Sequence, residues 1–277
     1  MPAKLMDGKA LAERIRAEVA EEVKELGHVG LTTILVGDDP ASDIYIRRKH
    51  EAANEVGIVA RDYRLAEDTS QQELLELIDQ LNQDESVDGI LVQLPLPPQI
   101  DENRAIEAVD PAKDVDGFHP INAGRLFLGH EGVVAATPTG IMALLDEYDV
   151  QLQGANAVVV GRSNIVGKPV SMLLLARHAT VTICHSRTLD LAEHAREADV
   201  LVVAVGQAGL ITPEMVKAGA TVVDVGMNRT ENGLRGDVQS AVAEHAGLMT
   251  PVPGGVGPMT IASLLRNTLK ATRRRRC

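Results

Sequence analysis

The sequence predicts an α/β protein of two domains, each built on a parallel β-sheet that is covered by helices on both faces. Its 277 residues correspond to about two domains, at roughly 100 to 200 residues per domain. Short apolar runs alternate with segments of helical period through residues 31–94 and again through 155–226. Such alternation is typical of parallel βαβ units. A stretch rich in Pro, Gly and Asp at 95–140 separates the two regions.

The first region is expected to open with an amphipathic helix at 7–26, because its apolar residues recur every three or four positions among charged ones. The further elements follow in order: a buried strand with a Gly-Asp turn at 31–39, a helix from an N-cap at Ser42 to about Val56, a strand at 59–65, a helix at 71–83 and a strand at 88–94. Residues 95–140 are expected to be irregular and to border a functional site, because long loops of this composition tend to carry function.

The second region is expected to form another α/β unit. Its elements are a strand at 155–161, a helix near 166–177, a strand at 179–186, a helix near 190–197, a strand at 198–206, a short helix near 213–218 and a strand at 220–226. A short helix after 236–238, a second Pro/Gly loop at 248–260 and a final helix complete the chain. The closing run Arg273–Arg276 is expected to be a solvated tail that also favours the helix C-terminus, with a recruitment signal as the alternative.

Composition excludes several classes of function. The formal net charge is −12 and there are only five aromatic residues, so the surface repels phosphate backbones and offers few rings for stacking bases, and no nucleic-acid partner is expected. Two cysteines, Cys184 and Cys277, cannot form a disulfide framework, and the N-terminus lacks an apolar signal core, which indicates a cytoplasmic protein. No apolar run approaches the roughly 18 residues of a membrane helix, so no membrane partner is expected.

A candidate dinucleotide-binding turn lies between an apolar strand and a helix at Gly161-Arg162-Ser163-Asn164-Ile165-Val166-Gly167. A tight glycine turn followed by free helix N–H groups is suited to a phosphate. Ser163 replaces the middle glycine of the GxGxxG pattern, so an ordinary βα turn is the alternative.

The end of the next strand favours NADP over NAD. It has Cys184-His185-Ser186-Arg187 where an NAD-binding protein usually has a carboxylate for the ribose 2′-hydroxyl. Arg162, Ser186 and Arg187 are suited to a 2′-phosphate instead.

Two further candidates lie in the first region. Tyr45 and Lys49 are one helical turn apart and share a face, although this spacing alone is common on solvated helices. Gln93 ends the strand at 88–94, and side chains at the carboxyl ends of parallel strands point toward the ligand crevice; a strand-end cap is the alternative.

Asp114-Val115-Asp116-Gly117 lies within the irregular stretch. A carboxylate held in a turn can accept two N–H bonds from a planar edge such as that of a 2-amino-4-oxopyrimidine ring. A calcium loop is the rival, but Phe118 and Pro120 stand where alternate oxygen ligands are needed. The eight scattered His residues give no other ligand spacing, so no metal is predicted.

The loop Pro251–Thr260 is too rich in Pro and Gly to be a regular element, and it ends where a helix begins. Small residues and free N–H groups let a flat ring or a phosphate approach the backbone, so a binding role is favoured over a merely structural turn.

Taken together, these motifs resemble the bifunctional 5,10-methylenetetrahydrofolate dehydrogenase/cyclohydrolase family. The matching blocks occur in the family's order: VGDDPASDIYIRRK, DGILVQLPLP, KDVDGFHPINAGRL, TPTG, VVVGRSNIVGKP, CHSRT, VDVGMN, GDV and TPVPGGVGPMT. They span nearly the whole chain. The resemblance implies a folate-binding catalytic domain at 1–138, joined by the returning C-terminal helix at 262–277, and a Rossmann-like NADP-binding domain at 139–261, arranged around a cleft.

The resemblance also implies roles for individual residues. Lys49 matches the catalytic lysine, Tyr45 an aromatic residue that packs on the aminobenzoyl ring of the folate, Gln93 the residue that orients the lysine, and Asp116 the aspartate that holds the pterin edge. Arg162, Ser163 and Ser186 match contacts to NADP phosphates. Pro253, Gly254 and Gly255 match residues beside the folate and the nicotinamide.

The implied activity is oxidation of 5,10-methylenetetrahydrofolate with NADP+, followed by hydrolysis of the methenyl product to 10-formyltetrahydrofolate. A cytoplasmic homodimer acting on tetrahydrofolate derivatives in one-carbon metabolism and purine biosynthesis is expected. Two rival classes stay open on the residues alone: a two-domain dehydrogenase of another small substrate, such as an amino acid or a shikimate-like acid, and a catalytically silent folate- or NADP-binding protein.

Overall fold

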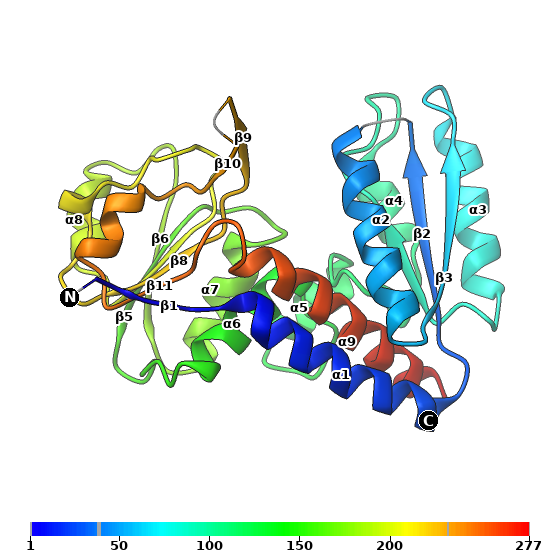
Figure 1. Ribbon diagram of the computed structural model, residues 1–277. Coiled ribbons are helices and arrows are strands. Elements are labelled where there is room, and N and C mark those ends of the chain that lie inside the picture. The colour runs from blue at the N-terminus through cyan, green and yellow to red at the C-terminus, as the bar shows by residue number, and fades with distance from the viewer. Residues whose placement is uncertain (1, 38–39, 232, 277) are drawn as a thin grey trace. The chain divides into compact units, whose positions relative to one another are not determined.

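The structure is a computed structural model that describes residues 2–37, 40–231 and 233–276, with the backbone alone described at 40–45 (Figure 1). The chain divides into two compact units. The first, called here the six-stranded unit, comprises Met1–Glu13 and Thr137–Thr260. The second, the three-stranded unit, comprises Arg14–Ala136 and Ile261–Cys277. Both are α/β units with parallel sheets, as the sequence predicted.

The three-stranded unit is built on a parallel sheet in the order β3-β2-β4. Its strands are β2 (Gly30–Val36), β3 (Val59–Leu65) and β4 (Gly89–Val92), and its helices are α2 (Pro40–Glu55), α3 (Gln71–Gln83), α4 (Glu102–Ala108) and α5 (Pro120–Phe127). Ser70 and Glu73 form a capping box that starts α3. The buried face of α3 then packs with β2 and β4 into one apolar core.

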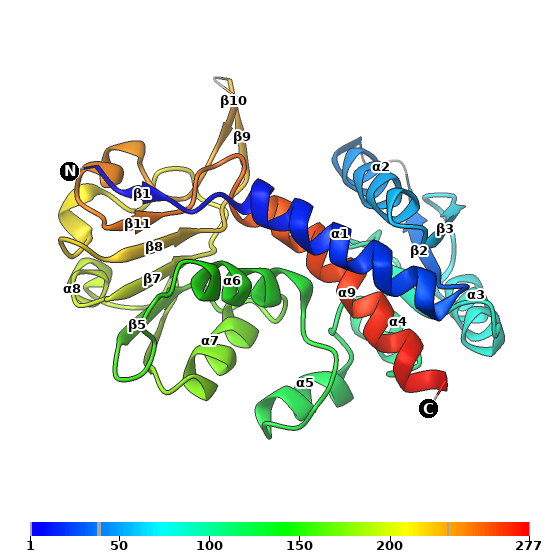
Figure 2. The same ribbon diagram turned by 60° about the horizontal axis from the view of Figure 1, so that its bottom comes forward.

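Two long helices, α1 (Gly8–Leu26) and α9 (Val256–Arg276), contribute to this unit from residues 14 and 261 onward. They run side by side in both ribbon views (Figures 1 and 2). Two ion pairs join them, Arg266 with Glu18 and Arg273 with Glu22. Pairs of this kind on an exposed surface contribute little, about 0 to 1 kcal/mol each, so apolar burial along the helices supplies most of the stability of this contact.

The six-stranded unit contains a parallel sheet in the order β1-β11-β8-β7-β5-β6. The strands are β1 (Lys4–Leu5), β5 (Asn156–Val160), β6 (Thr180–Cys184), β7 (Val200–Val203), β8 (Thr221–Asp224) and β11 (Leu248–Met249), and a hairpin of β9 (Asn228–Thr230) and β10 (Gly233–Arg235) is added. Helices α6 (Ala136–Glu147) and α7 (Gly167–Ala176) lie on one side of this sheet in Figure 2, while α8 (Leu191–Arg196), η1 (Pro213–Met215) and η2 (Ser240–Glu244) share a core with its other face.

Several expected elements differ from the structure. Helix α2 begins at Pro40, so Ser42 is inside the helix and is not its N-cap. The prediction was wrong because proline, with φ already fixed at a helical value, is well suited to the first helical turn. The stretch 95–140 was expected to be irregular, yet it contains α4, α5 and the start of α6. Its Asp and Pro residues are helix starts: Asp101 caps α4 and His119-Pro120 opens α5.

The N-terminal segment was also not anticipated as a strand. Lys4 and Leu5 pair in parallel with Leu248 and Met249, which groups the first 13 residues with the six-stranded unit. Within the described residues, no helix combines the length and the apolar character needed to cross a membrane.

Candidate functional site

Lys49 and Gln93 meet within the three-stranded unit. Lys49 lies on α2 and is only 6% exposed. Its Nζ donates to Gln93 Oε1 at 3.2 Å. Gln93 follows β4 directly, where its backbone N–H donates to Ile34 O on the neighbouring strand. Its own side-chain Nε2 donates to Leu94 O at 2.8 Å, so the amide oxygen is the end that faces the lysine.

Burial changes the chemistry of Lys49. Desolvation lowers the pKa of its ammonium group, and the negative charge of Asp116 opposes this shift. A lysine with a lowered pKa spends more time neutral, and in that form it can accept a proton. The hydrogen bond to Gln93 fixes the position of the Lys49 Nζ.

Asp116 is the carboxylate that acts on this lysine. Burial raises the pKa of its carboxyl group to about 6; the charge of Lys49 lowers it and the charge of Asp114 raises it further. Each of these two charges acts on the other; Lys49 is buried and Asp116 is partly buried. Residues with such perturbed pKa values cluster at functional sites.

Asp114 has a different task from Asp116, although the sequence presents them as one motif. Its Oδ1 accepts from the backbone N–H groups of Gly117 and Phe118, and its Oδ2 accepts from His119 N and Asn122 Nδ2. Gly117 has φ of 71°, and a Cβ there would lie 2.6 Å from Ala135 N. Asp114 and Gly117 therefore fix the loop that carries Asp116.

Tyr45 lies one helical turn before Lys49 on α2, as predicted. Its side chain falls outside the described residues.

The candidate dinucleotide loop lies in the six-stranded unit, between β5 and α7. Gly161 has φ of 130°, and a Cβ there would clash with Ala204 O beyond β7. A Cβ at Gly167 would in turn clash with Gly161 O. The first and last glycines of the motif are thus required by close backbone packing.

Ser163, at the position of the missing middle glycine, caps α7 from within the loop. Its Oγ accepts from the backbone N–H groups of Val166 and Gly167 at 3.1 and 3.3 Å. The side chains of Arg162 and Ser163 are exposed, whereas Val166 is partly buried. The loop thus combines a capped helix N-terminus with an exposed cation beside it.

Ser186 and Arg187 are exposed in the turn that follows β6. Two neighbours that the sequence analysis did not select hold this turn. His185 N donates to Thr188 Oγ1 at 2.9 Å, and Arg187 N donates to His185 Nδ1 at 3.1 Å. Both could have been identified from the sequence by their place in the turn: His185 is two residues before Arg187, and Thr188 follows it directly.

Pro253, Gly254 and Gly255 lie in the loop before α9. Gly255 N donates to Pro251 O at 2.8 Å, and Gly254 O accepts from Lys9 N at 3.0 Å. These contacts tie the loop to the first turn of α1 within the six-stranded unit.

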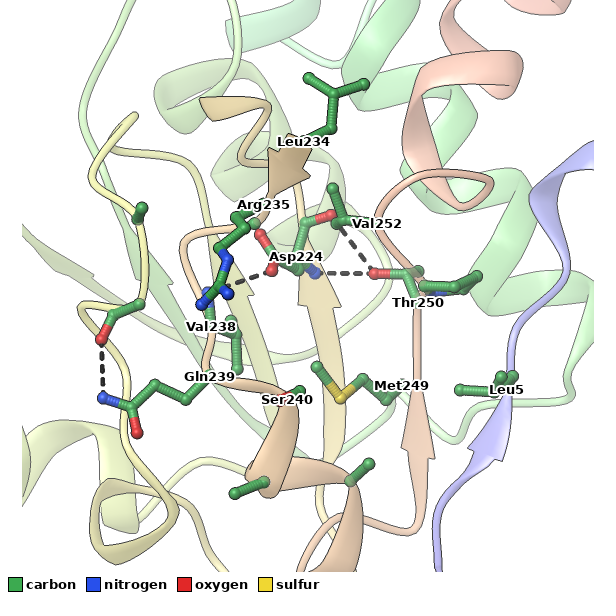
Figure 3. Close-up of a pocket in the computed structure, with 16 residues that line it drawn as sticks. Leu5, Asp224, Leu234, Arg235, Val238, Gln239, Ser240, Met249, Thr250 and Val252 are labelled. Atoms are coloured by element: carbon green, nitrogen blue, oxygen red, sulfur yellow. Dashed lines mark hydrogen bonds between the residues drawn. The ribbon is translucent and has the colours of Figure 1, made fainter. Parts of the chain in front are cut away.

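A separate cavity of about 690 Å³ lies in the same unit beside β8, β10 and β11 (Figure 3). Asp224 and Thr250 face it, and Asp224 N donates to Thr250 Oγ1 at 2.8 Å. Burial raises the pKa of Asp224 to about 6. Pro251 and Val252, the first residues of the predicted binding loop Pro251–Thr260, line this cavity. The other site residues predicted above are not among the described residues that do so.

Within the described part of the chain, His, Cys, Asp and Glu side chains do not gather in groups of three or more that could hold a metal ion. The polar side chains predicted for the site lie in two sets, one in each unit. The three-stranded unit holds Lys49, Gln93 and Asp116, and the six-stranded unit holds Arg162, Ser163, Ser186 and Arg187.

Comparison with protein families gives two matches that together span most of the chain. Residues 6–116 match the model described as tetrahydrofolate dehydrogenase/cyclohydrolase, catalytic domain. Residues 135–276 match the model described as tetrahydrofolate dehydrogenase/cyclohydrolase, NAD(P)-binding domain.

Individual relatives are similar over their full length. The bifunctional protein FolD of Moorella thermoacetica is 58% identical, with 99% of this chain and 100% of that protein covered. The crystal structure of the bifunctional FolD methylenetetrahydrofolate dehydrogenase/cyclohydrolase of Campylobacter jejuni superposes with a TM-score of 0.97 at 49% identity, covering 99% of each chain. The Trypanosoma brucei methylenetetrahydrofolate dehydrogenase-cyclohydrolase, solved with NADP cofactor and an inhibitor, gives 0.95 at 39% identity, again covering 99% of each.

Proposed function

The chain belongs to the tetrahydrofolate dehydrogenase/cyclohydrolase family, and we propose that Lys49, Gln93 and Asp116 form the site at which its folate substrate reacts. It is a bifunctional enzyme that oxidises 5,10-methylenetetrahydrofolate to the methenyl form and hydrolyses that product to 10-formyltetrahydrofolate. The observation that carries the site assignment is the buried Lys49 hydrogen-bonded to Gln93, with the charge of Asp116 acting on the lysine.

The dehydrogenase step depends mainly on positioning. Bound NADP+ supplies a hydride acceptor. A nitrogen lone pair of the folate helps to expel the hydride from the methylene carbon, so the protein needs to hold the substrate in place and supplies no strong base. We propose that Asp116, as a carboxylate, accepts two N–H bonds from the pterin edge. Tyr45 is proposed to pack on the aminobenzoyl ring.

The cyclohydrolase step needs a group that moves protons. Water attacks the methenyl carbon, and neutral Lys49 accepts the proton that this water loses. The carbinolamine then loses its hydroxyl proton as the bond from the carbon to N5 breaks, and N5 gains a proton. Overall one proton is released. The lowered pKa of Lys49 supports this role because it increases the neutral fraction of the amine.

The NAD(P)-binding domain contains residues that fit NADP. Gly161 allows a close backbone approach, and Gly167 allows α7 to pack against it, while Ser163 Oγ holds the N–H groups of Val166 and Gly167 at the start of α7. The turn after β6 has no carboxylate, and it exposes Ser186 and Arg187. We propose that these two side chains, with Arg162 and Ser163, bind the phosphates of NADP and favour it over NAD. Pro253, Gly254 and Gly255 are proposed to lie beside the nicotinamide ring and the folate.

We also propose the functional division into a folate-binding domain at 1–138 with 262–277 and an NADP-binding domain at 139–261. A cytoplasmic homodimer with a place in purine biosynthesis is proposed from the full-length resemblance to the family. Sedimentation of the purified protein tests the dimer, and a sedimenting monomer rejects it.

One assay tests the proposed function. Purified protein is mixed with 5,10-methylenetetrahydrofolate and either NADP+ or NAD+, and the absorbance of the methenyl product is followed as it forms and decays. The expected result is formation followed by decay, with a lower KM for NADP+ than for NAD+. No absorbance change with either cofactor rejects the proposal, and equal KM values reject the NADP preference.

A further inference from the structure

Asp237 is a buried carboxylate that the proposed mechanism does not use. It belongs to the GDV motif at 236–238 and is fully buried. Its Oδ2 accepts from the backbone N–H groups of Val205 and Gly206, at 2.8 and 2.9 Å. Its Oδ1 accepts from Asn228 Nδ2 at 2.8 Å. A carboxylate that accepts two adjacent backbone N–H groups holds that piece of backbone in one conformation.

The turn that Asp237 holds is next to the candidate dinucleotide loop. β7 ends at Val203, and Val205 and Gly206 come directly after Ala204. Ala204 N donates to Val160 O at 2.8 Å, and Ala204 O lies so close to Gly161 that a Cβ would not fit. This turn is therefore at the carboxyl end of the sheet, where open α/β sheets bind their ligands.

The position of Asp237 is itself fixed from a neighbouring strand. Asp224, at the end of β8, accepts from Asp237 N at 2.9 Å and from Val238 N at 3.0 Å. Asp237 O accepts from Ile211 N at 3.1 Å. Backbone and side chain of Asp237 thus connect the ends of β7 and β8 with the β9–β10 hairpin through Asn228.

We propose that Asp237 is a positioning residue for the cofactor: its carboxylate fixes the Val205–Gly206 turn and, through Ala204, the space beside Gly161 in which the dinucleotide binds. This inference rests on the proposed cofactor site. Asp237 touches neither substrate nor reacting atoms in this role, and it acts through the backbone that borders the cofactor.

The test is Asp237→Asn, which keeps the size of the side chain and removes its charge. An amide cannot serve all three donors. If the oxygen of the new amide side chain accepts from Val205 and Gly206, its NH2 group faces the NH2 group of Asn228, and two donors cannot bond to each other. Asn228 can rotate its amide only by losing its hydrogen bond to Arg235 O. We expect the KM for NADP+ to rise about tenfold, because hydrogen bonds to a charged group are the strong ones. Hydrolysis of supplied methenyltetrahydrofolate needs no hydride transfer, and its kcat/KM should stay within about twofold.

Asp199→Asn is the matched control. Asp199 also accepts a backbone N–H, that of Asn156 at 2.9 Å, but it precedes β7 and so lies at the opposite end of the strand. Its substitution should leave the KM for NADP+ unchanged within about twofold.

An unchanged KM for NADP+ in Asp237→Asn overturns the proposal. So does a parallel fall of both activities with KM constant, since that is the result of a merely structural role. If Asp237→Asn does not fold, Asn228→Ala replaces it: the carboxylate stays but loses one anchor, and a KM rise of about threefold is expected. No rise in that variant also overturns the proposal. Failure of the wild type to oxidise methylenetetrahydrofolate with NADP+ rejects the proposed function instead.

Discussion

The three-stranded and six-stranded units build their proposed sites in different ways. In the three-stranded unit Lys49 and Asp114 are buried, and burial shifts the pKa values of Lys49 and Asp116 in opposite directions. In the six-stranded unit Arg162 and Arg187 are exposed, and close backbone packing at Gly161 excludes any side chain. Chemistry that moves protons needs desolvated side chains, whereas recognition of a dinucleotide needs a backbone of the right shape.

The largest loss of stability is expected from a substitution at Gly161, where the backbone packs closely. Gly161→Ala places a Cβ against Ala204 O at a φ of 130°. We expect the free energy of unfolding to fall by about 2 to 4 kcal/mol, and the KM for NADP+ to rise with it. Chemical denaturation and steady-state kinetics with NADP+ measure the two effects.

Gly154→Ala is the control for Gly161→Ala. Gly154 has φ of 78°, but no atom lies within 4 Å of an added Cβ. Gly154→Ala should lower the free energy of unfolding by about 1 to 2 kcal/mol, because of the backbone conformation alone. It should leave the KM for NADP+ unchanged. Equal effects of both substitutions would show that close packing at Gly161 has no special role.

A second prediction concerns a buried charge outside the proposed site. Asp88 is 1% exposed and accepts from Arg275 Nη1 at 2.9 Å and Arg276 Nη2 at 3.1 Å. Arg275→Ala should lower the free energy of unfolding by about 1 to 3 kcal/mol, because a buried carboxylate loses one of its cations. Arg274→Ala, at an exposed position on the same turn, should change it by less than about 0.5 kcal/mol. Denaturant unfolding distinguishes the two, and equal losses contradict the assignment.

This pair also corrects the expectation for the C-terminal run. Arg273–Arg276 was expected to be a solvated tail, and part of it is docked. Arg275 and Arg276 bind Asp88, just before β4, and Arg276 also donates to Leu26 O at 3.0 Å. A charge run gives no indication of a buried partner 187 residues away in sequence.

Regular elements were predictable where one local pattern determines them. The strand at 59–65 and the helix at 71–83 match β3 and α3. In α3 the apolar period and the capping box at Ser70 agree. Strand β1 has two residues and exists only through pairing with β11, which no local pattern shows. Helices α4 and α5 begin at Asp and Pro signals that also mark loops.

The candidate site shows the same division between local and tertiary determinants. Lys49 and Gln93 were selected from motif and position, and the structure joins them by a hydrogen bond. The separate tasks of Asp114 and Asp116 could not be read from their shared motif, because only the folded loop shows which carboxylate is occupied by N–H groups. Asp237 was missed for the same reason, because its partners Val205 and Gly206 are brought to it by tertiary structure. His185 has local partners, and its position in the turn was the signal that could have identified it.

A third prediction concerns the pH dependence of substrate binding in the three-stranded unit. The pKa of Asp116 is raised to about 6, so its carboxyl is protonated below that pH and loses its ability to accept two N–H bonds. The KM for 5,10-methylenetetrahydrofolate should therefore rise as pH falls below about 6, by up to about tenfold per unit. Asp116→Asn should have a high KM that does not rise further as pH falls below about 6. A flat profile in the wild type contradicts the role of Asp116.

The effect of Asp116 on stability has the opposite sign. Its folded-state pKa lies above the ordinary value of 3.8, so the folded protein binds this proton more tightly than the unfolded chain does. Its contribution to the free energy of unfolding should increase as pH falls from above 6 toward 3.8.

The smallest effect is expected on the exposed side of the cofactor site. Arg187→Gln removes a cation from the turn after β6, while the hydrogen bond from the backbone N of residue 187 to His185 Nδ1 can remain. The ratio of kcat/KM for NADP+ to that for NAD+ should fall by about three- to tenfold, because an exposed charge is screened by water and salt. Arg196→Gln on α8 provides a control in the same unit with an expected change below about twofold. An unchanged ratio in Arg187→Gln removes Arg187 from the proposed 2′-phosphate contacts.

In the proposed hydrolytic step the buried amine of Lys49 moves the proton. Lys49→Met keeps the length and apolar stem of the side chain and removes the amine, and the decay of supplied methenyltetrahydrofolate tests it directly. We predict a loss of about 10²- to 10⁴-fold in cyclohydrolase kcat, with NADP+ binding unchanged and full activity in Arg48→Met, whose side chain is exposed on the same helix. Hydrolysis by Lys49→Met at the wild-type rate would contradict the account.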